Sequence, residues 1–542
     1  LYDAIINITG GDEIAENLNF NYLFSGNAFS YQGTSLSTFG SDLAFQGFVN
    51  LANASNISGG EGLFQNTQMG LVGQVELDYN SAFYLTLSAR QDYDSRLGVP
   101  GTQFESADYS FLYPAASLSF LLSELLPQSD VLSFAKIRAS WAQVGGPPPF
   151  AYLTSSGYGV TSVGDGWGDS LNFPIQGVTG FEIDSILGNS ELKSELTEEI
   201  EFGIDLRFFN NRIGLDVAYY QRKMTDAILN ASLPASTGYN NVWLNSGRMT
   251  GKGIEATLNL AIAQSENFTW NSQINFTSSE NIVEELAPGL DKLFLAGFTG
   301  AGSYLLAGSQ YGAVLGGTYL RTGSGGPNDD GLTTPEGAVV INDDPLSNEY
   351  GFQAVDPVQR GIGDPNPDFV LGWNNNMKIG PVNVGFLLDW REGGDMLNGV
   401  AWALSFFGRS QLTADTRVEA PTPIVGVKSD GSPNDIPVVR DQYYYQSSVG
   451  GFGSVWEQFV EDGGWIRLRE VSLGYDIPMS KIGIDFIDSG NISIVGRNLW
   501  YSTEYNGVDP ETSLTGVGNG QGVDYFNMPS TRSVMFKLNL NL

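Results

Sequence analysis

A two-residue periodicity recurs along the chain and is clearest in its last ten residues, SVMFKLNLNL. Even-numbered residues from Val534 to Leu542 are apolar, whereas odd-numbered residues from Ser533 to Asn541 are mostly polar. Because successive side chains of a β-strand point to opposite faces, the segment predicts a strand with one apolar and one polar face. Repeated strands of this kind, each of about ten residues, are typical of a transmembrane antiparallel β-barrel.

The same alternation predicts an all-β fold with about fifteen strands. The regular segments lie at residues 71–79, 83–90, 136–141, 199–208, 213–219, 254–262, 268–276, 382–390 and 533–542. Less regular ones lie near 113–122, 369–378, 466–476 and 490–499, and two weak ones near 2–9 and 17–26.

The connections between these segments alternate in length. Short ones fall near 80–81, 123–133, 210–211, 264–267, 379–381 and 477–489. Long ones, rich in Gly, Asp, Asn and Pro, fall approximately at 27–67, 93–112, 143–196, 223–252, 279–368, 392–465 and 500–531. Outer-membrane barrels place short turns in the periplasm and long loops outside. We therefore expect residues 1–542 to form part of one barrel with long extracellular loops.

The direction of the strands gives a further expectation. If the short turns are periplasmic, the C-terminal strand runs downward, which means toward the periplasm. Because neighbouring strands alternate in direction, the strand near 2–9 then runs downward as well. Bacterial single-chain barrels have an even number of strands, and a complete one should start with an upward strand. We therefore expect this chain to lack the beginning of its barrel.

Composition narrows the possible functions. The formal net charge of −34 disfavours a nucleic-acid partner, because neutralising phosphates needs clustered Lys and Arg. Cys and His are both absent, which excludes thiolate and imidazole metal ligands, Cys nucleophiles and Ser-His-Asp triads. An enzyme would have to rely on paired carboxylates. We expect no enzymatic activity, no catalytic residue and no cofactor.

Two runs rich in Asn and Asp raise the question of a Ca²⁺ site, since hard cations bind oxygen ligands. The runs are Asn328, Asp329, Asp330 and Asn342, Asp343, Asp344. Neither run has a Gly and a closing Glu at the spacing of a complete calcium loop. Turns closed by Asn and Asp side chains are therefore the preferred interpretation, and we predict no metal site.

Several separated motifs resemble one known family. The stretches WIRLREVSLGYDIP (465–478) and ISIVGRNLWYSTEYNGVDPE (492–511), followed by Asp524, Pro529 and the final strand, resemble the C-terminal end of the SusC/RagA family. Upstream stretches at 113–124, 137–145, 197–229, 247–260, 363–376 and 390–399 also resemble its barrel segments, in the family's order. These proteins are TonB-dependent outer-membrane transporters of the Bacteroidetes type.

The resemblance implies a function and partners. The whole protein would be a barrel of about 22 strands with an N-terminal plug, and this chain departs from the family because the plug and about seven strands are absent from it. It would import an oligosaccharide or peptide with a SusD-like surface lipoprotein as a lid, driven by TonB through a segment not in this chain. It would contact outer-membrane lipid and could form a dimer of transporter–lipoprotein pairs.

The long loops carry the candidate contact residues. Aromatic side chains anchor protein interfaces and stack on ligands, so candidate contacts with substrate or lid are Tyr158, Trp167, Trp402, Phe406, Phe407, Tyr443, Tyr444, Tyr445 and Trp456. Packing of the loops against one another is the alternative for each. Polar candidates for the barrel lumen are Asp389, Arg391, Glu392 and Asp395, for which an ion-pair network in the wall is the alternative.

Two other functions stay open at this point. One is a passive porin of 14–16 strands, which the odd strand number and the very long loops disfavour. The other is a secreted all-β enzyme or carbohydrate-binding protein. It would need polar residues on the outward strand faces, where this chain has strips of Leu, Ile, Val and Phe.

Overall fold

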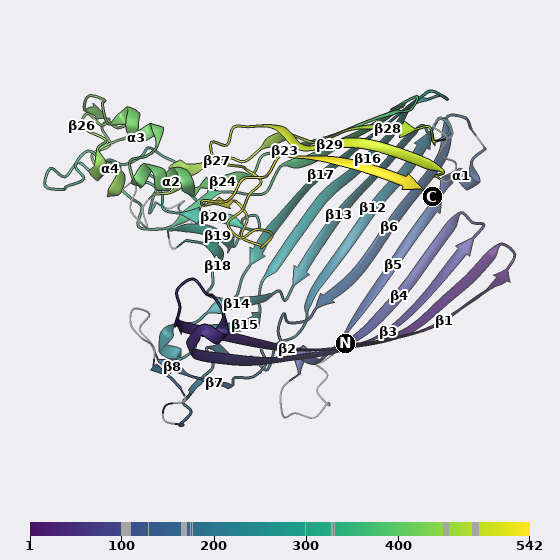
Figure 1. The fold of residues 1–542 in the computed structure, drawn as a ribbon, viewed down its shortest axis with the longest axis horizontal. Helices are drawn as coiled ribbons and strands as arrows, with labels where there is room; N and C mark the ends of the chain where they lie inside the picture. Colours follow the sequence, from purple (N-terminus) through teal and green to yellow (C-terminus); the bar gives the residue numbers. More distant parts are fainter. Residues whose placement is uncertain are drawn as a thin grey trace. The chain divides into compact units, whose positions relative to one another are not determined.

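A computed structural model describes residues 1–98, 110–127, 129–163, 171–173, 175, 177–298, 300–326, 329, 331–447, 455–479 and 487–541. A 15-stranded sheet dominates it, with strands in the order in which they occur in the chain (Figure 1). The strands are β1 Tyr2–Ala15, β2 Leu18–Leu43, β3 Ala54–Tyr79, β4 Phe83–Asp94, β5 Ser110–Leu121, β6 Leu132–Gly146, β12 Glu195–Phe208, β13 Ile213–Thr225, β16 Arg248–Gln264, β17 Phe268–Glu285, β22 Phe369–Ile379, β23 Val382–Glu392, β28 Trp465–Ile477, β29 Ser489–Thr503 and β31 Ser533–Asn541. The predicted all-β fold is confirmed.

The chain divides into two compact units, and each is described by itself. The first unit comprises Leu1–Leu125, Ile137–Glu201 and Arg222–Arg248. Besides β1 to β5 it contains α1 Leu122–Leu125 and short strands in the connections. These are β7 Tyr158–Val160, β8 Ser162–Val163, β9 Leu171–Asn172, β10 Phe181–Ile183, β11 Ile186–Leu187, β14 Ile228–Ser232 and β15 Asn241–Asn245, with single 3₁₀ turns at Leu51–Asn53, Ser95–Leu97 and Ala235–Thr237.

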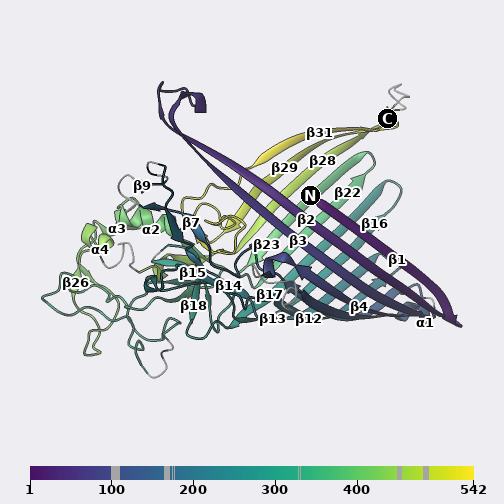
Figure 2. The ribbon, with the colours of Figure 1, turned by 90° about the horizontal axis from the view of Figure 1, so that it is seen from below.

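The second unit comprises Leu126–Lys136, Phe202–Gln221 and Met249–Leu542. Figure 2 shows its last strands, β28, β29 and β31, side by side. Its long connections contain β18 Lys292–Gly297, β19 Ala301–Leu306, β20 Ala313–Gly316, β21 Arg360–Gly363, β24 Asp395–Asn398, β25 Thr422–Pro423, β26 Pro437–Val438, β27 Val460–Asp462 and β30 Val523–Asp524. They also contain the helices α2 Gly399–Phe406, α3 Gln411–Thr416 and α4 Gln442–Gln446 and a 3₁₀ turn at Glu457–Phe459.

Residues with positive φ make the short turns possible. Asn80 and Ser81 adopt φ values of 56° and 52° between β3 and β4. Asn210 and Asn211 adopt 55° and 64° between β12 and β13. Asn tolerates this left-handed region better than most residues. Both turns lie where the sequence predicts them.

The apolar faces of the strands are exposed in the chain. Phe536 and Leu538 of β31 are 78 % and 61 % exposed, and Phe202 of β12 is 57 % exposed. A soluble protein rarely leaves a large contiguous apolar surface uncovered, so these strips fit strands that face lipid. Among the described residues, no helix has the length and apolar character required to cross a membrane.

The structure differs from the expectation of a long loop at 27–67. Most of these residues belong to β2 and β3, which pair in one unchanged register from Leu18 opposite Tyr79 to Leu43 opposite Ala54. The connection itself is only residues 44–53. The segment is rich in Ser, Gly and Thr, so its hydrophobic pattern is weak, but backbone hydrogen bonds to a neighbouring strand do not depend on side-chain hydrophobicity.

Candidate functional site

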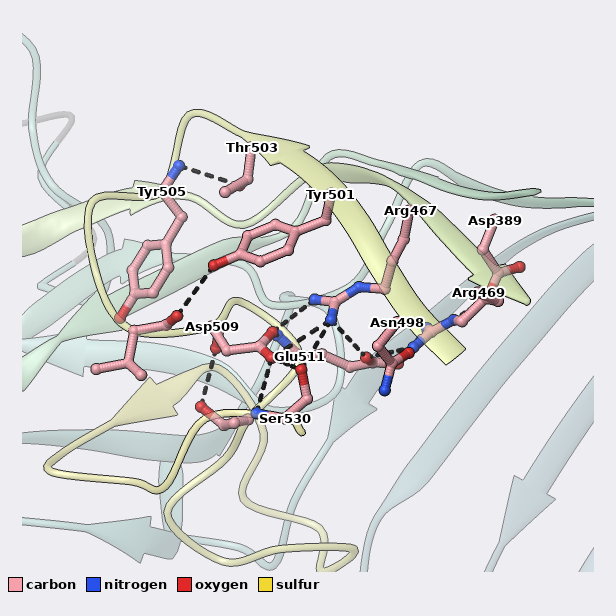
Figure 3. A network of polar contacts seen from close by, with 12 residues as sticks. Asp389, Arg467, Arg469, Asn498, Tyr501, Thr503, Tyr505, Asp509, Glu511 and Ser530 are labelled. Atoms are coloured by element: carbon pink, nitrogen blue, oxygen red, sulfur yellow. Dashed lines mark hydrogen bonds and ion pairs between the residues drawn. The ribbon is translucent and has the colours of Figure 1, made fainter. Parts of the chain in front are cut away.

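A β-bulge in β28 places two arginines beside the last long connection, residues 504–532. Against β23, the register of β28 shifts between Leu468 and Glu470, so Arg469 is an extra residue on that side. The register between β28 and β29 shifts at the same place. Bulges redirect side chains relative to the regular alternation of a strand. Arg467 lies opposite Asp389 of β23 in the ladder. Figure 3 shows Arg467 and Arg469 reaching toward the same segment of this connection.

Arg467 forms a buried ion pair with Asp509. Its Nη2 lies 2.6 Å from Asp509 Oδ1, and both side chains are 1 % exposed. The backbone N–H of Glu511 and both the N–H and the hydroxyl of Ser530 also donate to the Asp509 carboxylate. Burial raises the pKa of Asp509, but the hydrogen bonds from Arg467, Ser530 and Glu511 outweigh it and hold the pKa below its usual value. The connection is thereby fixed to the wall by an ionised carboxylate.

Arg469 adds a second, more exposed contact. Its Nε donates to Asp389 Oδ2 at 2.6 Å, and its terminal nitrogens donate to both carboxylate oxygens of Glu511. The guanidinium carbon also lies 4.8 Å from the ring centroid of Trp465, a distance at which cation–π attraction operates. The two arginines therefore join β23, β28 and the connection 504–532 in one network.

Asp389 and Arg391, two of the predicted lumen candidates, occupy the polar face of β23. Asp389 enters the network through Arg469. Arg391 Nη2 donates to the backbone carbonyl of Pro365 at 2.5 Å, so it contacts the connection that precedes β22 instead.

The other two lumen candidates lie at and beyond the end of β23. Glu392 accepts a hydrogen bond from the indole N–H of Trp390 at 2.9 Å and stays outside the network. Asp395 accepts from the backbone N–H of Asp364 at 2.8 Å, and burial raises its pKa above the usual value. The four candidates thus divide between the network and separate anchoring contacts.

The three long connections of the second unit share one apolar core. Trp402 of α2 and Trp456 stack with ring centroids 4.5 Å apart and are 2 % and 1 % exposed. Val314 of β20, from the connection before β22, and Val523 of β30, from the last connection, pack in the same cluster. In addition, β24 pairs antiparallel with β27 and parallel with β30. The connections therefore form a folded structure beyond the strands.

A second aromatic cluster forms around α4. Tyr444 and Tyr445 are 5 % and 6 % exposed and pack with Phe352. The hydroxyl of Tyr445 is hydrogen-bonded to Thr416 Oγ1 at 2.8 Å. These two tyrosines stabilise the connection and present little surface to a ligand.

The remaining aromatic candidates are accessible. Tyr158, in the first unit, is 76 % exposed, and Phe407 and Tyr443, in the second, are 66 % and 46 % exposed. Phe406 is partly buried, and its ring packs edge-on against Phe407 at a centroid distance of 5.1 Å. Trp167 lies outside the described residues.

The Asx-rich runs form turns and an ion pair. Asp329 lies 2.6 Å from Arg360, and both side chains are buried. Hydrogen bonds from Arg360 and from backbone N–H groups hold the pKa of Asp329 well below its usual range. Asn342 accepts from the N–H of Asp344, which itself accepts from the N–H of Leu346, as in Asx turns. Asn328 and Asp330 lie outside the described residues.

Sequence reasoning missed Arg467 and Arg469 as members of the site. Both residues stand in a segment that carries the family resemblance, and in a regular strand their i, i+2 spacing would put them on one face. Asp509 and Glu511 have the same spacing 42 residues later. Two pairs of opposite charge with equal spacing are the signal that could have identified the network.

Comparison with known proteins gives consistent results. Residues 6–369 match the family described as TonB dependent receptor-like, beta-barrel. The chain is 27 % identical over 491 residues to TonB-dependent receptor P3 of Formosa agariphila, covering 87 % of this chain and 45 % of that protein. It is 22 % identical over 498 residues to TonB-dependent receptor SusC of Bacteroides thetaiotaomicron, covering 88 % and 44 %. The chain thus spans less than half the length of these relatives.

Solved structures show the same fold. The structure of the RagAB peptide transporter superposes with a TM-score of 0.75 at 17 % identity, covering 99 % of this chain and 55 % of that one. The RagAB peptide importer in its open-open state superposes with a TM-score of 0.71 at 19 % identity, covering 100 % and 54 %.

Proposed function

Because the chain belongs to the TonB dependent receptor-like β-barrel family, we propose that it acts in TonB-dependent import of a nutrient across the outer membrane. The family is one of outer-membrane receptors and transporters and not of enzymes. Import by the whole protein would require contact with TonB.

The proposed cargo is an oligosaccharide or a peptide, and the proposed partner is a SusD-like surface lipoprotein. One relative is named SusC, and the structures with high TM-scores are described as RagAB peptide transporters and importers. These likenesses support a shared mode of action, in which the lipoprotein holds the cargo at the mouth of the barrel.

The observation that carries the proposal is the folded state of the long connections. Three of them share the core around Trp402 and Trp456, and the last one is fixed to the wall by Arg467. A preformed surface loses little conformational entropy when it binds a partner. Phe407 and Tyr443 are exposed on it and offer aromatic contacts of the kind that dominate interfaces.

The test is purification of the native protein from outer membranes, with identification of what accompanies it and an uptake assay in the same cells. We expect a surface lipoprotein to co-purify and nutrient uptake to fall when Phe407 and Tyr443 are both replaced by Ala. Leu346→Ala is the matched control, since that apolar residue is 91 % exposed in a neighbouring connection. Absence of a lipoprotein together with unchanged uptake in the double variant would contradict the proposal.

A further inference from the structure

The connection between β23 and β28 contains a cavity of about 520 Å³. Its walls come from the end of α2, from α3 and from the beginning of α4, all in the second unit. This volume lies within the range of about 300–1,000 Å³ that is typical of small-molecule sites. The cavity is therefore large enough for one or two units of a sugar or a peptide.

Three arginines line this cavity: Arg409, Arg417 and Arg440. The chain has 26 Lys and Arg against 60 Asp and Glu, so a cluster of three cations runs against its overall charge. Among the lining residues that the structure describes, Asp441 alone is a carboxylate, and it already accepts a hydrogen bond from the N–H of Tyr444. The cavity wall thus carries a local excess of positive charge.

The arginines differ in how far their charges are compensated within the protein. Arg440 forms an ion pair with Glu419. Arg417 Nη2 donates to the backbone carbonyl of Gly408 at 3.0 Å, a neutral acceptor. The Arg409 side chain has no ion pair or hydrogen bond within the described part of the chain. Two guanidinium groups therefore retain uncompensated charge.

We propose that this cavity binds an oxyanion, a carboxylate or sulfate group, carried by the imported nutrient. Guanidinium groups form strong two-point hydrogen bonds with such oxyanions. Phe407 also lines the cavity, and its exposed ring offers an apolar surface for the body of the ligand. That the ligand is cargo rests on the proposed function, whereas oxyanion binding itself rests on the cavity.

Titration calorimetry of the protein purified in detergent tests the inference with two matched pairs of probes. Digalacturonate is compared with a neutral digalactoside, and the C-terminally amidated dipeptide Glu-Glu with the amidated Gln-Gln, so that a sugar source and a peptide source are distinguished. We expect the acidic member of one pair to bind about tenfold more tightly than its neutral partner, as charged hydrogen bonds imply. Added salt should weaken that binding. Equal affinity within both pairs would overturn the inference.

Arginine variants test whether the acidic probe binds in this cavity. Arg409→Gln alone, and together with Arg417→Gln, should lower the affinity for the acidic probe about tenfold. Because Arg409 is exposed and its side chain forms no hydrogen bond or ion pair with the described residues, the single variant should fold normally. Lys428→Gln removes the same charge outside the cavity, where Lys428 pairs with Asp435, and should bind as the unmodified protein does.

The variants also separate this inference from the proposed function. Equal losses in the Lys428 variant, or none in the arginine variants, would contradict the cavity as the site. The binding assay needs neither TonB nor a partner, so a failure of import would leave its result unchanged.

Discussion

Arg467 of β28 and Asp509 of the last long connection form a buried ion pair with an Nη2–Oδ1 distance of 2.6 Å, although 42 residues separate them in the chain. The pair fixes an irregular segment to a regular strand. Asp509 also accepts a hydrogen bond from Ser530, which lies close to the start of β31. The connection 504–532 is therefore held near both of its ends.

Replacing Asp509 by Asn should loosen this connection. The variant leaves the Arg467 charge buried, with Glu511 as its next acidic neighbour at 3.6 Å. Breaking a buried pair from one side costs about 3–5 kcal/mol. We expect faster proteolysis within residues 504–532 and a lower free energy of unfolding in detergent.

Two further variants distinguish a buried charge from lost packing. Arg467→Met with Asp509→Leu removes both charges and should recover part of the lost stability. Glu470→Gln breaks the exposed pair with Arg497 and should cost at most about 1 kcal/mol. An Asp509→Asn variant as stable as the Glu470→Gln variant would contradict this account of the pair.

The ion pair of Arg467 and Asp509 also predicts that the stability of the connection 504–532 depends on pH. The pKa of Asp509 is lower in the folded state than the unfolded value of about 3.9. The carboxylate therefore contributes full stability above about pH 4, and this contribution is lost as the pH falls through the folded pKa. Hydrogen exchange of residues 504–532, corrected for its intrinsic pH dependence, should rise below about pH 4. Protection that stays constant down to pH 2 would exclude this role.

The contribution of Asp395 to stability should depend on pH in the opposite direction to that of Asp509. Burial raises its pKa, so the folded state binds this proton more tightly than the unfolded state does. Its contribution to stability therefore falls as the pH rises from about 3.9 through the folded pKa. Asp395→Asn removes the buried charge and keeps an oxygen for the N–H of Asp364. We expect the variant to be more stable than the parent at pH 7 and equal to it at pH 3. Lower stability at pH 7 would refute the prediction.

Trp456 and Phe407 give a matched comparison of a buried and an exposed aromatic residue. Trp456 is 1 % exposed in the shared core, whereas Phe407 is 66 % exposed. Truncating a core Trp or Phe to Ala costs about 3–5 kcal/mol, whereas exposed positions usually change stability by about 0.5 kcal/mol or less. Denaturant unfolding of both variants should show this difference. Similar losses in both would mean that Phe407 is packed in solution.

Alternation predicted most of the sheet because each strand has one apolar and one polar face. It was weakest where the backbone departs from regular pairing. The segment 466–476 is irregular in sequence because Arg469 is an extra residue relative to β23, so apolar side chains change from even positions at Ile466 to odd positions at Leu473. A bulge leaves no other trace in a two-residue pattern.

The candidate site was less predictable than the sheet. The pair of Arg467 and Asp509 depends on how a connection folds back onto a strand, which local pattern does not encode. Likewise, Trp402 and Tyr443 lie in the same connection, but one is buried and the other exposed. Aromatic composition made this connection a candidate contact region. Which of its aromatic side chains are buried depends on contacts with two other connections, and the composition does not show those contacts.

The most direct test of the central claim is uptake of labelled oligosaccharides and peptides by cells carrying the native protein, with and without TonB. TonB-dependent import predicts accumulation that requires both TonB and this protein and stops when the proton gradient is collapsed. Uptake that requires this protein but continues unchanged without TonB would contradict the claim and indicate a passive pore.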